Sequence, residues 1–195
     1  MPAGISRALT WAWATTSEVR GALHSLIVLL ALALPAPALF ADSVYETDAA
    51  FLERAFSGDP PAAQLMWLSG EVKERVRELL GHDYPALRLR YWCRDQRSAW
   101  ILEEIGKELP ITVGIIVQAG RIESVRVMVY RENRGGEVSR PAFVDQFRGA
   151  GSGRHRGLDM KIDGITGATL SVQALTRLSG VALFLHTQTE CVNGS

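Results

Sequence analysis

Residues 111–130 read ITVGIIVQ-AG-RIESVRVMVY, and this stretch decides the fold. The run before Ala119-Gly120 is rich in β-branched side chains, which favours a strand. Ala119-Gly120 is a two-residue turn, and the residues after it alternate in character. Val125, Val127 and Val129 are predicted on one face of the second strand, and Arg126, Met128 and Tyr130 on the other. The stretch therefore predicts an antiparallel β-hairpin.

Regular segments are also predicted before the hairpin. In the second of them, Ser69 is the expected N-terminal cap and Gly81 the expected end, because apolar side chains recur between them at helical spacing. The predicted segments are helices over residues 48–56 and 71–80 and strands over residues 87–93 and 98–105.

After the hairpin the sequence predicts one long C-terminal helix, with an apolar stripe of Val172, Leu175, Leu178, Val181, Ala182 and Leu185. Between hairpin and helix, residues 143–147 form a short element of undetermined type. Residues 149–156 form a glycine-rich loop that we expect to be flexible. Together these segments predict an α+β fold, a twisted and mainly antiparallel sheet with helices packed on it.

The candidate functional residues lie directly before the C-terminal helix, where residues 163–171 read DGITGATLS. The first amides of a helix have no partners within it, and the helix dipole favours negative charge there. A phosphate on Thr169 would lie in that field, and Gly167 and Ala168 would leave the approach free of bulk. Asp163 could orient this loop or help to activate the hydroxyl. Serine, threonine and glycine are also ordinary capping residues, and from the residues alone capping carries more weight.

The sequence Asp163-x-x-Thr166-Gly167-Ala168-Thr169 resembles the flavinylation signature of the FMN-binding domain family. Members of that family include the periplasmic flavin-bearing subunits of sodium-translocating quinone reductase and Rnf-type complexes. In the family, a separate flavin transferase esterifies the last threonine of the signature with the phosphate of FMN. The resemblance thus implies covalent FMN on Thr169, in a cofactor-binding loop at the N-terminus of the C-terminal helix. The implied site comprises Asp163, Thr166, Gly167, Ala168, Thr169 and Ser171.

The similarity extends upstream of the signature and spans residues 109–187. It includes Gly120-Arg121-Ile122 at the hairpin turn, Glu132 with Gly135 after the hairpin, and residues 143–149. Other candidate flavin contacts are less specific. Trp92, Trp100, Tyr130 and Phe147 are candidates to pack on the flavin ring, and each is more often a core aromatic. Arg148, Arg154 and His155 are candidates for the phosphate or ribityl chain, and each is more often a solvated loop residue.

Residues 1–41 are predicted to direct export. Basic residues precede an apolar run that is shorter than the roughly 20 residues a bilayer span needs, and the run is broken by proline and ends in small residues. Cleavage would follow Ala38 or Ala41, and an uncleaved anchor is the alternative. Both alternatives place the remainder in the periplasm, soluble or tethered to the inner membrane. The residues concerned are Arg7, Arg20, the run from Leu26 to Phe40, Pro35 and Pro37.

Charge and cysteine content exclude other classes of protein. The 21 basic and 21 acidic residues give a formal net charge of 0, and without a basic stripe nucleic-acid binding is not expected. The two cysteines, Cys93 and Cys191, form no CxxC pattern, so neither a zinc nor a haem site is indicated. An oxidising compartment permits a disulfide between them, and two free thiols or a mobile tail that holds Cys191 are equal alternatives.

The sequence thus predicts three parts: a signal peptide or anchor over residues 1–41, a helical and strand extension over 42–108, and an FMN-binding domain over 109–195. The function implied by the resemblance is electron transfer, with a flavin transferase for attachment and a membrane or periplasmic redox partner. A flavin-dependent reductase of a small acceptor and a cofactor-free binding module are the open alternatives. No acid/base set is visible, which favours a carrier over a free-standing enzyme.

Overall fold

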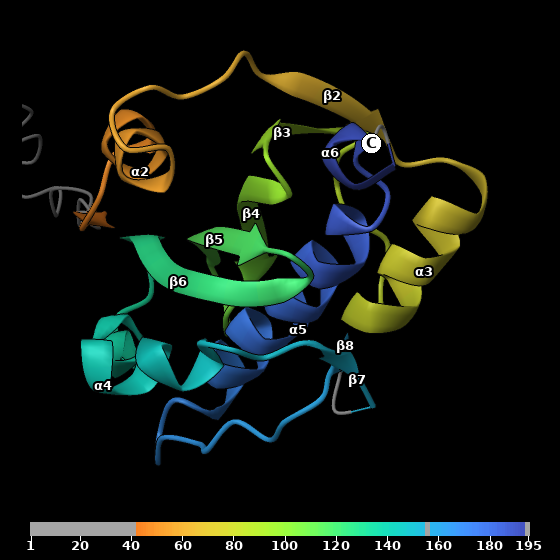
Figure 1. The fold of residues 1–195 in the computed structure, drawn as a ribbon. Coiled ribbons are helices and arrows are strands. Elements are labelled where there is room, and N and C mark those ends of the chain that lie inside the picture. The colour runs from red at the N-terminus through yellow and green to blue at the C-terminus, as the bar shows by residue number, and fades with distance from the viewer. Residues whose placement is uncertain (1–41, 155–156, 194–195) are drawn as a thin grey trace, which may run out of the picture. The chain divides into compact units, whose positions relative to one another are not determined.

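A computed structural model describes residues 42–154 and 157–193 of the chain, and the predicted signal or anchor over residues 1–41 lies outside them. The described residues belong to one compact unit. Its centre is a six-stranded antiparallel sheet with the strand order β1-β6-β5-β4-β3-β2 (Figure 1). The strands are β1 (Ser43–Val44), β2 (Gln64–Trp67), β3 (Arg88–Arg94), β4 (Arg97–Ile105), β5 (Pro110–Gln118) and β6 (Arg121–Tyr130).

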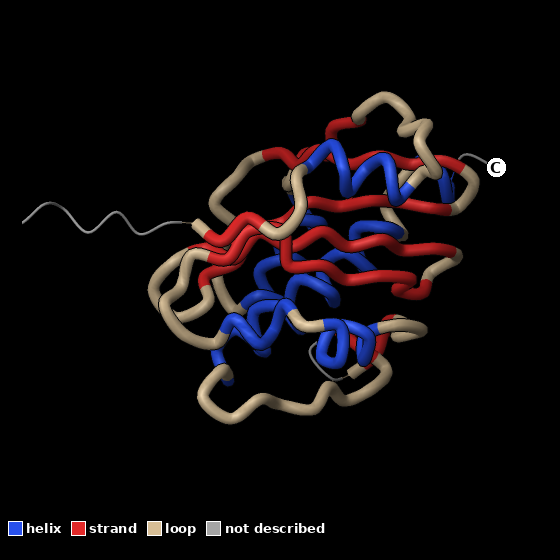
Figure 2. Tube along the Cα trace, turned by 90° about the vertical axis from the view of Figure 1, so that its left-hand side faces the viewer, coloured by secondary structure: helices blue, strands red, loops and turns tan. Residues whose placement is uncertain are grey.

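Helices cover both faces of this sheet, which confirms the predicted α+β class. The long helix α5 and the helix α3 lie on one face, and α2 lies on the other (Figure 2). The six residues predicted as the apolar stripe of α5 are all buried. The helices are α2 (Asp48–Ala55), α3 (Gly70–Leu80), α4 (Pro141–Val144), α5 (Thr169–His186) and α6 (Glu190–Asn193), with 3-10 turns η1 (Gly136–Ser139) and η2 (Asp145–Phe147).

The predicted hairpin is confirmed as β5 and β6. Ala119 and Gly120 have φ angles of 49° and 75°, and two consecutive positive values are typical of the turn that joins twisted antiparallel strands. Asp95 and Gln96, with φ angles of 51° and 59°, join β3 to β4 in the same way. The two strands predicted over residues 87–93 and 98–105 therefore form a second hairpin.

The predicted faces of β6 are correct for Val125 and Val127 and wrong for Val129 and Tyr130. Val125 and Val127 lie in the core beneath α5, but Tyr130 joins them there and Val129 packs on the α2 side. A bulge causes the change: Val113 pairs with Val127 whereas Thr112 pairs with Val129, so one residue of β6 is passed over. An extra residue in one strand reverses the alternation beyond it.

A glycine in β5 allows α2 to lie close to the sheet. A Cβ atom at Gly114 would lie 2.5 Å from the ring of Phe51, so any larger residue would push the helix away. Phe51 is fully buried in a small cluster with Ala99, Ile116 and Met128. This second core holds α2 over β4, β5 and β6.

Several local predictions are refined by the structure. Ser69 is the N-cap of α3, but its side chain makes no capping hydrogen bond, whereas Gly81 ends the helix in the left-handed region as expected. Residues 143–147 are the end of α4 followed by η2. The glycine-rich loop of residues 149–156 includes β7 (Ser152–Gly153), which pairs with β8 (Gly157–Leu158) just beyond the loop. The edge strand β2 has no counterpart in the sequence prediction.

The structure joins Cys93 to Cys191 in a disulfide between β3 and α6, across a sequence separation of 98 residues. The question that the sequence left open is thereby answered. Residues 42–108 also supply β1 to β4, which share one sheet with the hairpin of residues 110–130. Among the described residues, no helix combines the length and apolarity needed to span a bilayer.

Candidate cofactor site

Thr169 is the first residue of α5, and its side chain is exposed. The N-cap residue is Ala168, which has no side-chain oxygen, and no side chain caps this helix. The motif therefore does not act as a side-chain cap, which was the alternative reading of the sequence. The amide groups of the first turn are left available to an anion.

A tight turn carries the chain into α5. Gly167 has a φ angle of 84°, and the Ala168 N–H donates to the carbonyl of Ile165 at 3.0 Å. The loop before the turn is held at one point by Gln146, whose side-chain oxygen accepts from the Asp163 N–H at 2.9 Å. These bonds fix the start of the helix, and the Thr169 hydroxyl takes part in none of them.

The first turn of α5 is tied to the end of β6. The Tyr130 hydroxyl lies 3.0 Å from Ser171 Oγ and donates to the carbonyl of Arg134 at 2.5 Å. Burial raises the pKa of Tyr130, so its hydroxyl keeps the proton that it donates. Gly135, with a φ angle of 87°, leaves room for this contact, because a Cβ atom there would lie 2.8 Å from the Tyr130 hydroxyl.

Glu132 fixes the loop that faces the same helix end. Its Oε1 atom accepts from the backbone N–H groups of Lys107, Glu108 and Leu109, at 2.6, 2.6 and 2.8 Å. Burial alone would raise the pKa of Glu132, but the three N–H bonds outweigh it and hold the pKa below its ordinary value. Glu132 is therefore charged at neutral pH, and its carboxylate is occupied by the three backbone N–H groups of the loop.

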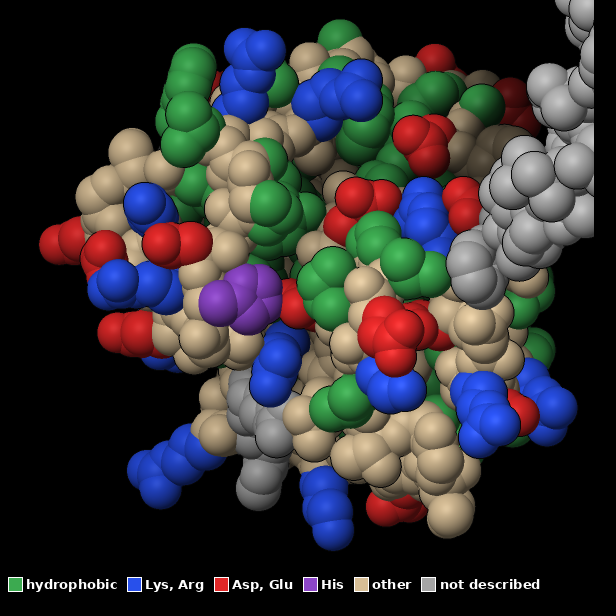
Figure 3. All heavy atoms as spheres, turned by 180° about the vertical axis from the view of Figure 1, so that it is seen from behind, with side chains coloured by type: hydrophobic (Ala, Val, Ile, Leu, Met, Phe, Trp, Pro, Cys, Tyr) green, Lys and Arg blue, Asp and Glu red, His purple; other side chains and the backbone are tan. Residues whose placement is uncertain are grey.

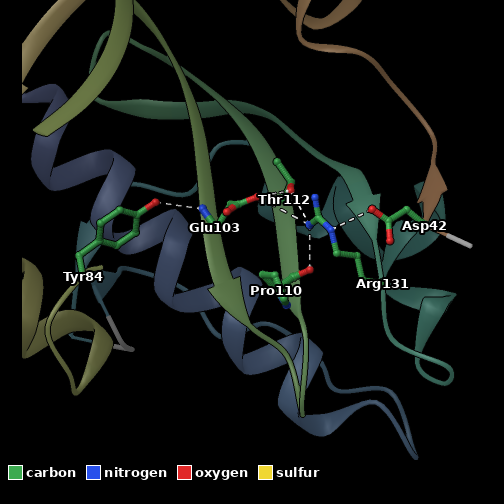
Figure 4. Close-up of polar contacts among 6 residues, drawn as sticks. All are labelled: Asp42, Tyr84, Glu103, Pro110, Thr112 and Arg131. Atoms are coloured by element: carbon green, nitrogen blue, oxygen red, sulfur yellow. Dashed lines mark hydrogen bonds and ion pairs between the residues drawn. The ribbon is translucent and has the colours of Figure 1, made fainter. Parts of the chain in front are cut away.

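The neighbouring Arg131 anchors the end of β6 to the rest of the sheet. Its guanidinium group contacts Asp42 at 3.2 Å and Glu103 at 3.6 Å, and it donates to Thr112 Oγ1 at 3.0 Å (Figure 4). It also donates to the carbonyl of Pro110 at 3.0 Å. Residues from β4 and β5 thus share one network with Arg131, the residue that directly follows β6, and this limits the movement of the segment after it.

Two clefts meet at Thr169. We call the first the Lys107 cleft; it has a volume of about 470 Å³ and contains the basic residues Lys107 and Arg134. We call the second the Met160 cleft; it has a volume of about 320 Å³ and a partly apolar wall. The Lys107 cleft is lined by Lys107, Glu108, Glu132, Asn133, Arg134 and residues 167–171. The Met160 cleft is lined by Met160, Lys161, Ile162, Gly164, Thr169, Val172, Gln173 and Thr176.

The structure brings part of the predicted site together. Gly167, Ala168, Thr169 and Ser171 line the Lys107 cleft, and Thr169 also lines the Met160 cleft. Asp163 and Thr166 are exposed in the preceding loop and line neither cleft. Of the six predicted residues, four therefore lie at the cleft and two lie on the approach to it.

Most of the less specific candidates for contact with the flavin lie away from the two clefts. Trp100 and Phe147 are fully buried, and Trp100 stacks on Tyr91 with ring centroids 5.1 Å apart. Trp92 lies on the other face of the sheet, next to the α2 cluster. Tyr130 contacts the site through its hydroxyl, at Ser171 and at the Arg134 carbonyl. Arg148 and Arg154 are exposed and line neither cleft, and His155 lies outside the described residues.

Sequence reasoning missed the residues that the fold brings in from a distance. Lys107 and Arg134 come from the loops before β5 and after β6, and only the pairing of those strands places them beside α5. Met160 and Ile162 come from the segment after β8. The hydrogen bonds from residues 107–109 to Glu132 carry no sequence signal, because backbone groups make them.

An uncapped helix N-terminus beside two clefts of ligand size gives this α+β domain an arrangement suited to an anionic cofactor. Residues 106–183 match the family model of the FMN-binding domain, so this part of the chain is an FMN-binding domain and its cofactor is FMN. The match includes the whole of the 163–171 motif. No curated protein sequence is similar enough to the chain to be matched with it.

The residues present fit this cofactor. A phosphate at the start of α5 would meet unpaired amides. The adjoining cleft adds two basic side chains, Arg134 and Lys107, of which Lys107 is paired with Glu108. The Met160 cleft offers apolar side chains of the kind that an aromatic ring system contacts, from Met160, Ile162 and Val172.

Proposed function

We propose that Thr169 carries FMN as a phosphoester and that the protein is an exported electron carrier. The position of the Thr169 hydroxyl is the observation that supports this most directly. It is exposed on the first residue of an uncapped helix and lies where two clefts meet. A hydroxyl placed there is accessible to a transferase, and the resulting phosphate would lie in the field of α5.

The residues around Thr169 have separate roles in this proposal. Lys107 and Arg134 bind the anionic end of the cofactor, and Ser171 with Tyr130 keeps the helix end in place. FMN itself, when bound, supplies reversible electron transfer. Because the ester is at the far end of the ribityl chain, the attachment leaves the ring free to meet a membrane or periplasmic redox partner.

The charged groups of the clefts favour a carrier over a reductase. Glu132 is engaged by three backbone N–H groups, and the exposed Glu108 forms an ion pair with Lys107 at 3.0 Å. Neither carboxylate is thus poised to exchange a proton with a substrate. A reductase that protonates its acceptor from a side chain would need such a group beside the ring.

Export is supported by a feature of the described residues. Cys93 and Cys191 form a disulfide, and disulfides persist in oxidising compartments and are rare in the cytosol. We propose that residues 1–41 act as a signal peptide or anchor and deliver the domain to the periplasm. Recovery of the chain with Met1 intact from the cytoplasmic fraction would contradict this, whereas periplasmic recovery of the domain would support it.

Co-expression with a flavin transferase tests the attachment. Mass spectrometry should find the mass of FMN, less one water, on the peptide that contains Thr169. Thr169→Ala should abolish the fluorescent band in a denaturing gel, and Thr169→Ser should retain part of it because the hydroxyl remains. Thr166→Ala tests the alternative acceptor, which lies three residues earlier in the sequence and lines neither cleft, and this variant should keep the band. A flavinylated Thr169→Ala protein would refute the assignment.

The role is tested by stopped-flow reoxidation of the reduced holoprotein. We expect slow reaction with a panel of small organic acceptors and fast reaction with a specific redox protein. Rapid and saturable turnover of one small molecule, without a partner protein, would assign the chain to the reductases instead.

A further inference from the structure

One part of the sheet is not covered by a helix. The cluster around Phe51 holds α2 over β4, β5 and β6, and the outer face of β2 and β3 remains exposed beside it. A groove of about 480 Å³ lies there, which we call the Arg88 groove. It is lined by Asp48, Leu65, Arg88, Leu89, Arg90, Trp92 and Ile101.

Large apolar side chains are exposed around this groove. Leu65 is 53% exposed, Trp67 is 61% exposed and Leu87 is 73% exposed. Trp67 lies opposite Arg88 in the pairing of β2 with β3, and the Arg88 guanidinium lies 5.8 Å from the Trp67 ring centroid. Leu65 lies opposite Arg90. Apolar and basic side chains therefore alternate across two neighbouring strands.

The two arginines of the groove lack acidic partners. Among the described residues, neither Arg88 nor Arg90 forms an ion pair, whereas Arg94 on the same strand contacts Asp59 at 2.9 Å. Asp48 is the one acidic residue in the lining, and it occupies the first turn of α2, where it offsets the helix dipole. Figure 3 shows basic and hydrophobic side chains side by side along the upper edge of the molecule, at the height of β2 in Figure 1.

We propose that the Arg88 groove docks an acidic segment of a partner protein, in which carboxylates alternate with apolar side chains. Carboxylates would pair with Arg88 and Arg90, and apolar side chains would cover Trp67, Leu65 and Trp92. Tryptophan and arginine are the residues that most often dominate the binding energy of protein interfaces. A hollow accepts a protruding chain segment better than it accepts the flat surface of a membrane.

The groove is well separated from the cofactor site. β2 lies at the top of Figure 1 and the loop before α5 lies at the bottom. A partner bound at the groove thus leaves Thr169 and both of its clefts accessible. The inference rests on the groove alone and stands whether or not Thr169 carries FMN.

A set of labelled peptides tests the proposal with the full chain. Peptides in which glutamate alternates with leucine or phenylalanine, at several spacings, are compared with counterparts that carry lysine in place of glutamate. Fluorescence anisotropy should show the best acidic peptide binding about tenfold or more tightly than its lysine counterpart, and the binding should weaken as salt is added. Trp67→Ser should weaken it while leaving the salt dependence unchanged.

Charge reversal supplies the matched comparison. Arg88→Glu with Arg90→Glu should weaken binding of the acidic peptide by about tenfold or more. Arg148→Glu with Arg154→Glu changes the net charge equally at two exposed arginines that line neither the groove nor the clefts at Thr169, and should leave binding nearly unchanged. Circular dichroism and thermal unfolding establish that both double variants are folded.

Three outcomes would overturn the proposal. The first is that no acidic peptide binds better than its lysine counterpart. The second is that the chain binds phosphatidylglycerol vesicles through Arg88 and Arg90 but binds none of the peptides, which would assign the groove to lipid. The third is a dimer in sedimentation velocity that the Arg88→Glu, Arg90→Glu variant dissociates, which would assign the groove to a second copy of the chain.

Discussion

The hydroxyl groups of Tyr130 and Ser171 lie 3.0 Å apart and join the last residue of β6 to the first turn of α5. Both side chains are buried, so the contact is shielded from water. It connects the hairpin that decides the fold with the helix end that presents Thr169. A tyrosine of the sheet thus helps to set the geometry of the candidate cofactor site.

Tyr130→Phe should lower the free energy of unfolding by about 1–3 kcal/mol, because the Arg134 carbonyl and the Ser171 hydroxyl lose their partner. Urea unfolding measures the change. Tyr45→Phe is the control, since Tyr45 is 53% exposed. Equal stability of the two variants would show that the Tyr130 hydroxyl contributes little.

Gly135→Ala should be more destabilising than Gly58→Ala. Both glycines have a φ angle of 87°, so both variants suffer about 1 kcal/mol or more of backbone strain. Only the Cβ atom at position 135 meets other atoms, at 2.8 Å from the Tyr130 hydroxyl, whereas position 58 is open. Thermal unfolding should therefore separate them, and Gly135→Ala should also reduce flavin attachment at Thr169. Identical losses of stability would argue against close packing at Gly135.

The stability of the protein should fall below about pH 6.5 because of His186. Its Nε2 atom accepts from the Gly120 N–H at 3.2 Å and its Nδ1 atom lies 2.8 Å from Ser98 Oγ, and burial lowers its pKa. The unfolded chain binds a proton near pH 6.5 while the buried ring stays neutral. The contribution of His186 is therefore complete above that pH and is lost as the pH falls. Urea unfolding from pH 7.5 to 5.5 should show this slope, and His186→Gln should flatten it.

His82 provides a control of opposite sign. Its bond to the Asp83 carbonyl, and then its contact with Glu104 at 2.9 Å, raise its pKa despite the opposing effect of burial. Its contribution is present below about pH 6.5 and is lost as the pH rises through the raised pKa. His82→Gln should therefore steepen the loss of stability on acidification. A His186→Gln protein with the wild-type slope would exclude His186 as its source.

Removal of the disulfide should cost about 2–5 kcal/mol, because Cys93 and Cys191 close a long loop in the unfolded chain. Cys93→Ser with Cys191→Ser should unfold at lower urea concentration than the wild type. Reductant should lower the stability of the wild type and leave that of the double variant unchanged. Wild-type stability that is insensitive to reductant would contradict this role for the bond.

The sequence alone was sufficient to predict those helices and strands that depend on residues close together in the chain. The β5–β6 hairpin, α2, α3 and α5 follow from periodicity and from turn residues such as Gly120 and Gly81, which act within a few positions of the chain. The motif before α5 was also local, and its likeness to the FMN-binding domain family agrees with the match over residues 106–183. The motif thereby singled out Thr169 without coordinates, and flavin attachment at Thr169 stays a prediction.

Only the tertiary structure decided the features that depend on pairing between distant residues. The bulge at Met128 moves Tyr130 to the α5 side, and without it the Tyr130–Ser171 contact would not exist. Strand pairing brings Lys107 and Arg134 to Thr169, and it sets Trp67 beside Arg88. The periodicity of the sequence predicts which face of a strand a side chain occupies. It does not predict which residue of the neighbouring strand lies opposite, because packing across the whole sheet sets the pairing register.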